Sequence, residues 1–103
     1  MSRIAKLQEL LESNGDDSFL QHALALEYVK EGDDQKARLL FESILTREPS
    51  YAGSYYHLGK LLERLNEIPL AITWYEKGLA ICKASNDRHA YSELQGALEE
   101  ITD

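Results

Sequence analysis

Apart from carboxylates, the side chains best suited to metal or nucleophilic chemistry in this sequence are those of His22, His57, His89 and Cys82. Metal ligands and catalytic pairs recur at short, fixed spacings, because their side chains must converge on one atom. These four residues lie far apart in the chain and show no such spacing. We therefore expect no metal site, and we interpret Cys82 as an ordinary helix residue rather than a nucleophile.

The sequence motifs of the common enzyme classes are also missing. The chain has no Gly-rich phosphate loop, no Gly-x-Ser-x-Gly turn and no His-Glu-x-x-His pair. The prediction is a protein that is not an enzyme and that binds no cofactor.

Composition limits the class of partner. Eighteen acidic and eleven basic residues give a formal net charge of −7, which argues against nucleic acid, whose phosphates need a basic face. The single cysteine permits no internal disulfide, which fits a reducing compartment. The N-terminus has no apolar signal segment, and no stretch is apolar enough to span a membrane. We expect a cytoplasmic, single-domain protein with no nucleic acid or membrane partner.

The elements that position these residues follow from a pattern of 34 residues that is repeated between Ser18 and Ser85. At this shift Phe41 falls on Tyr75, and the same shift matches six further pairs: Leu24–Leu58, Ala25–Gly59, Tyr28–Leu62, Ala37–Ala71, Glu42–Glu76 and Leu45–Leu79. A fixed period of this size indicates stacked supersecondary units that cannot bury their apolar faces alone.

Apolar residues three and four positions apart predict six helices. We expect Gly15 to end the first helix in a left-handed conformation, Gly32 to end the second, and Pro49 to end the third. Asp17 or Ser18, and later Asp33 or Asp34, should cap the helices that follow. The predicted helices cover about residues 2–13, 18–31, 34–47, 51–65, 67–83 and 87–101.

The repeated residues resemble the tetratricopeptide repeat, a two-helix unit of about 34 residues. The first repeat supplies Leu24, Ala25, Tyr28, Ala37, Phe41 and Pro49, and the second supplies Tyr55, Leu58, Gly59, Ala71 and Tyr75. Gln21 and Lys83 depart from the family pattern, which has an aromatic residue and a proline there. The resemblance implies an all-α, right-handed superhelix of about six antiparallel helices that binds a protein or peptide.

The repeat pattern also divides the chain. Residues 1–17 form an N-terminal half-repeat, residues 18–51 and 52–85 form two full repeats, and residues 86–103 form a capping helix with a polar outer face. Tyr91 follows its counterpart Tyr55 by 36 positions, so we expect two extra residues in the loop after the second repeat.

In the family that the chain resembles, the first helices of successive repeats line a concave groove. Lys60 and Arg64 would give this groove a mildly basic margin beside the ring of Tyr56. Carried onto this sequence, the lining residues are Phe19, His22, Leu26, Val29 and Lys30 in one unit, Tyr56, His57, Lys60, Glu63 and Arg64 in the next, and His89 and Ser92 in the last helix.

Two alternatives remain open from the sequence. The second apolar stripe of the 18–31 helix, which includes Phe19 and Leu26, either docks a partner or packs between neighbouring helices. The chain either binds a peptide or protein segment in the groove or assembles with itself, for example as a homodimer. Binding of chaperone tails by a carboxylate clamp is disfavoured, because the clamp positions hold His22, Leu26, His57, His89 and Glu93 instead of fixed cations.

Overall fold

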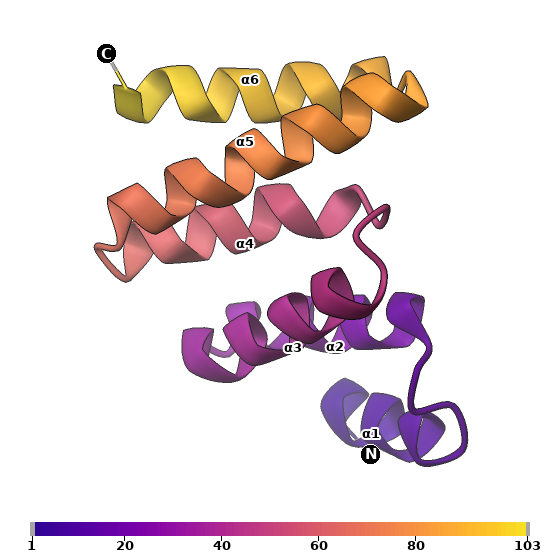
Figure 1. The fold of residues 1–103 in the computed structure, drawn as a ribbon. Helices are drawn as coiled ribbons and strands as arrows, with labels where there is room; N and C mark the ends of the chain where they lie inside the picture. Colours follow the sequence, from indigo (N-terminus) through magenta and orange to yellow (C-terminus); the bar gives the residue numbers. More distant parts are fainter. Residues whose placement is uncertain (1, 103) are drawn as a thin grey trace.

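The computed structural model describes residues 2–102, and the regular structure of this range consists of six α-helices (Figure 1). The all-α fold is therefore confirmed, and every helix end lies within two residues of the predicted one. The helices are α1 (Arg3–Ser13), α2 (Ser18–Lys30), α3 (Asp34–Arg47), α4 (Gly53–Arg64), α5 (Ile68–Ser85) and α6 (Arg88–Thr102).

The helices stack in the order of the chain. Each helix packs on the next from α1 to α6, and α4 also contacts α6. Figure 1 shows the resulting elongated stack, with α1 at one end and α6 at the other, and its extents are 43 × 29 × 20 Å. The first helices also touch one another directly, since His22 of α2 bonds Ser54 of α4 and Lys60 of α4 pairs with Glu100 of α6.

Local hydrogen bonds explain where the helices begin and end. The carboxylates of Asp17 and Asp33 cap α2 and α3 by accepting backbone N–H groups. Gly32 ends α2 with φ of 80°. The expectation of a left-handed Gly15 is wrong, because α1 already ends at Asn14, with φ of −137°. The Asn14 amide donates to the Leu10 carbonyl at 3.0 Å, so a carbonyl of the last turn is satisfied without a glycine.

The residues matched by the 34-residue shift form one continuous core. Phe41 and Tyr75 have no exposed surface, as predicted for equivalent core positions. Gly59 lies against the ring of Tyr75, and a Cβ atom at residue 59 would overlap that ring. A Cβ atom at Gly78 would come within 2.7 Å of the Cβ atom of Tyr55. These two glycines are therefore required for close helix packing.

The connection from α5 to α6 differs from the predicted one. The expectation of two extra loop residues is wrong: α5 has 18 residues against 14 in α3, and only residues 86 and 87 join it to α6. Lys83 stands where Pro49 ends α3, so the helix continues for another turn. Asn86 then reverses the chain with φ of 61°.

The length and hydropathy of a helix decide whether it could cross a membrane. Within residues 2–102, no helix combines the length and the apolar character that crossing a membrane requires.

Candidate protein-binding surface

The predicted groove residues of α2 are exposed to very different degrees. The Phe19 side chain is 70% exposed in the first turn of the helix. Leu26 and Val29 are half-buried and pack against the core, so this part of the second stripe also serves helix packing. Lys30 is exposed, and its ammonium lies 3.2 Å from the Glu27 carboxylate. Phe19 is thus the side chain of this stripe that a partner can reach most freely.

A cluster of rings joins α2 to α4. Nδ1 of His22 and Oγ of Ser54 share a hydrogen bond of 2.8 Å, which satisfies a serine that is fully buried. The His22 ring lies 5.5 Å from the ring of His57 and 5.6 Å from that of Tyr51, measured between centroids. The His57 ring stacks on Phe41 at 6.1 Å. Both histidines are therefore fixed in place by the two repeats together.

Burial changes the protonation of these two histidines. Desolvation, the larger cause, and the charge of the neighbouring His57 together lower the pKa of His22 to about 4. Desolvation also lowers the pKa of His57, although the charge of Glu93 acts in the opposite direction. Both rings are therefore neutral at pH 7 and present a polar but uncharged surface.

We predict that the protein loses stability between pH 7 and pH 5 because of His22. The pKa of a histidine in the unfolded chain is about 6.5, above the folded value, so the unfolded state binds the proton first. The contribution is complete above pH 6.5 and is lost as the pH falls toward 4. With allowance for solvent screening, it amounts to about 1 kcal/mol by pH 5.

Urea denaturation at the two pH values tests this prediction. The variant His22→Gln, which can still reach Ser54 with an amide, should lose less stability on acidification than the wild type. The control His89→Gln alters an exposed residue of α6 and should keep the wild-type difference. Equal pH dependence of the wild type and His22→Gln would contradict the role assigned to His22.

The middle of α4 carries the aromatic and charged residues of the predicted groove. Tyr56 is half-buried, whereas its neighbour Tyr55 lies in the core. The Lys60 ammonium lies 5.7 Å from the centroid of the Tyr56 ring. The same ammonium is 3.7 Å from the Glu63 carboxylate and 3.6 Å from that of Glu100. The tyrosine, the lysine and the two carboxylates thus form one connected group.

The second cation of α4 is paired as well. The Arg64 guanidinium donates two hydrogen bonds to the Asp34 carboxylate, at 3.2 and 3.0 Å, and so links α4 to the start of α3. Glu63 also accepts a hydrogen bond from the hydroxyl of Tyr75. The basic margin expected from Lys60 and Arg64 is therefore largely neutralised by carboxylates that belong mostly to other helices.

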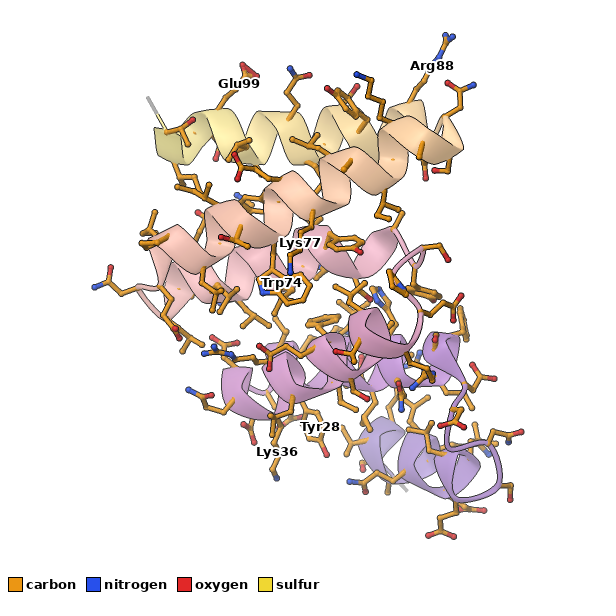
Figure 2. All side chains as sticks on the ribbon, viewed as in Figure 1. Tyr28, Lys36, Trp74, Lys77, Arg88 and Glu99 are labelled. Atoms are coloured by element: carbon orange, nitrogen blue, oxygen red, sulfur yellow. The ribbon has the colours of Figure 1, made fainter. Side chains whose placement is uncertain are left out.

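The predicted residues of α6 lie apart from this group. His89 and Ser92 are exposed, and within residues 2–102 no hydrogen bond, ion pair or ring contact joins them to α4. Gly96, which follows Lys60 by 36 positions, leaves open space where a side chain would stand. Figure 2 shows Arg88 and Glu99 extending outward from α6, which agrees with a polar outer face.

Sequence reasoning missed Tyr51 and Ser54, which complete the ring cluster. The repeat shift offers one signal: Ser54 occupies the position equivalent to the apolar Leu20. A polar residue in such a position needs a hydrogen-bond partner, but the sequence does not show that this partner is His22. In the part of the chain that the structure describes, no three His, Cys, Asp or Glu side chains gather closely enough to hold a metal ion.

Known proteins share the repeat and the helical stack of this chain. The tetratricopeptide repeat model matches residues 52–85. A TPR repeat-containing protein of Pseudomonas aeruginosa is 24% identical over 98 residues, which are 95% of this chain and 93% of that protein. The crystal structure of a tetratricopeptide repeat domain protein from Salinibacter ruber is 39% identical, with a TM-score of 0.80, and the match covers 82% of this chain and 94% of that one.

A further solved structure supports the fold alone. The solution structure of a Bordetella parapertussis protein has a TM-score of 0.85 at 24% identity, over 98% of this chain and 88% of that one. The helical stack is thus a repeat domain of the interaction type. The chain belongs to the tetratricopeptide repeat family, whose domains generally bind proteins or peptides and are typically not catalytic.

Proposed function

We propose that this protein binds a peptide or protein segment in the groove formed by α2, α4 and α6. One observation carries the proposal: aromatic and imidazole rings remain accessible on α2 and α4 although the core between the helices is already complete. Phe19 is 70% exposed, and Tyr56, which packs against the core, is half-buried, whereas Phe41 and Tyr75 are fully buried. Rings of this kind are the usual anchors of protein interfaces.

The charges of the groove favour a segment with apolar anchors. Lys60 and Arg64 are paired with carboxylates, and His22 and His57 are neutral at pH 7. The surface between the repeats is therefore polar without a strong net charge. Gly96 of α6 leaves open space that a side chain of the segment can occupy.

We predict that changing Tyr56→Ala together with Lys60→Gln abolishes binding of groove ligands. Ligands are first selected from a random peptide library displayed on phage, and their affinities are then measured by calorimetry. The expected loss is at least tenfold, because truncating an aromatic hot spot costs about 2 kcal/mol or more. Glutamine is preferred to glutamate at residue 60, since Glu63 and Glu100 already lie next to it.

The matched control is the double variant Leu39→Ala with Lys77→Gln. It removes one apolar side chain and one charge from α3 and α5, and Leu39 is 67% exposed. Both double variants should melt within a few degrees of the wild type. Full binding by the Tyr56 and Lys60 variant, or equal loss in the control, would show that the groove is not the binding site.

A further inference from the structure

A pocket of about 340 Å³ lies where α5 turns into α6, and we call it the α5–α6 pocket. The last turn of α5, the two linking residues and the first two turns of α6 form its walls. Its lining includes Cys82 and Lys83 from α5, Asn86 from the turn, and Arg88, Tyr91 and Ser92 from α6. Ser92 is also one of the residues that the proposed groove takes from α6.

Comparison of the two repeat junctions explains why this pocket exists. At the junction of α3 and α4, Tyr51 packs its ring 5.6 Å from His22, and the Tyr55 hydroxyl donates to the Pro49 carbonyl at 2.5 Å. Thirty-six positions later, Tyr51 is replaced by Asp87 and Tyr56 by Ser92. Two aromatic rings are thus exchanged for small polar side chains, while the extra turn of α5 adds a wall.

The pocket carries two cations that form no ion pair within the described residues 2–102. Lys83 and Arg88 are exposed, and neither forms an ion pair with any residue between 2 and 102. This distinguishes them from Lys60 and Arg64, whose charges are paired within the fold. Figure 2 shows Arg88 extending away from the stack, where a ligand can reach its guanidinium.

The other lining groups complete the electrostatics. The Asp87 carboxylate is the one acidic group of the lining, and it accepts the Ala90 N–H at 3.1 Å as the cap of α6. Burial raises the pKa of the Cys82 thiol, so this part of the lining is uncharged at neutral pH. The Asn86 amide and the hydroxyls of Tyr91 and Ser92 can donate hydrogen bonds. The lining therefore contains two cations, several neutral donors and one carboxylate, which already accepts a hydrogen bond as the cap of α6.

We propose that the α5–α6 pocket binds a carboxylate side chain of the segment that the groove takes. Two exposed cations and several neutral donors in one lining are the groups that recognise a carboxylate. This proposal rests on the proposed function, because it assigns an acidic residue to the groove ligand. The pocket is distinct from the clamp positions of the sequence comparison, since Lys83 and Arg88 lie at the α5–α6 turn and not among them.

A comparison of glutamate and glutamine peptides tests the pocket. Peptides selected from the random phage library on the wild-type protein should share one acidic residue. Replacing that residue by glutamine should weaken wild-type binding about tenfold, as expected for a charge-assisted hydrogen bond. The same replacement should have little effect on the double variant Lys83→Gln with Arg88→Gln. The control Lys6→Gln with Lys77→Gln removes equal charge elsewhere and should keep the full glutamate preference.

A second variant separates the shape of the pocket from its charge. Ser92→Tyr restores the aromatic residue that the first junction has at Tyr56 and keeps both cations. It should fill the pocket and reduce the glutamate preference to below about threefold. Selected peptides without a shared acidic residue, or a glutamate preference that survives both pocket variants, would overturn this inference while the groove proposal stands.

A direct titration covers the case in which no peptide is selected, which would overturn the proposed function. The wild-type protein is titrated with N-acetylglutamate N-methylamide and followed by the backbone amide signals of Asn86, Tyr91 and Ser92. Saturable shifts that the glutamine analogue and the Lys83 and Arg88 variant do not show would support a carboxylate site by itself. Absence of such shifts in the wild type would contradict the pocket assignment whatever the groove does.

Discussion

Replacing Phe41 with alanine should lower the free energy of unfolding by about 3–5 kcal/mol, the largest effect we expect from a single truncation in this protein. Phe41 has no exposed surface, and its ring supports the stacked His57 and the edge of His22. This loss of stability has two parts: the free energy that burial of the ring contributes, and the cost of the cavity that remains between α3 and α4. Urea denaturation followed by circular dichroism measures it.

Leu39→Ala is the control for this prediction. Leu39 lies in the same helix but is 67% exposed, so its truncation should change stability by about 0.5 kcal/mol or less. A loss below about 1 kcal/mol for Phe41→Ala would mean that the repeat register does not define the core.

The second large effect should come from Leu94→Asp, which places a carboxylate in the contact between α6 and α5. Leu94 is 1% exposed, and its Cδ1 atom lies 2.8 Å from the position that a Cβ atom would take at Gly78. An unpaired charge in this contact should cost about 3 kcal/mol or more. We expect α6 to detach, and the apolar surface of α5 that it covers should then drive self-association.

Size-exclusion chromatography with light scattering detects this change. Gln95→Asp introduces the same charge one residue further on, at an exposed position, and should leave the wild-type elution and melting unchanged. A Leu94→Asp protein with the mass and stability of the wild type would show that α6 is an appendage rather than the cap of the core.

The repeat period was sufficient to predict the core but not the junction at Asn86. Equivalent positions such as Phe41 and Tyr75 are buried alike, because stacked two-helix units repeat the same contacts. The α5–α6 turn depends on how far α5 continues when no proline stops it. A spacing of 36 between Tyr55 and Tyr91 could not distinguish a longer loop from a longer helix, and the structure has the longer helix.

The charges of the candidate site depended on contacts between helices. Lys60 and Arg64 look like free cations in the sequence, but their partners Glu100 and Asp34 lie 40 and 30 positions away. Such pairs depend on the relative placement of α4 against α3 and α6, which periodicity does not give. In the same way, the hydrogen bond between His22 and Ser54 could not be predicted from either residue type.

The most direct test of the groove proposal is chemical-shift mapping of a selected peptide on the isotope-labelled protein. The account predicts that the perturbed amides cluster on α2, α4 and α6, with the largest changes around Tyr56 and His57 and with little change around Leu39 and Thr73 on α3 and α5. Perturbations that gather around Leu39 and Thr73 and spare Tyr56 would contradict it, because the partner would then bind the opposite helices of the stack.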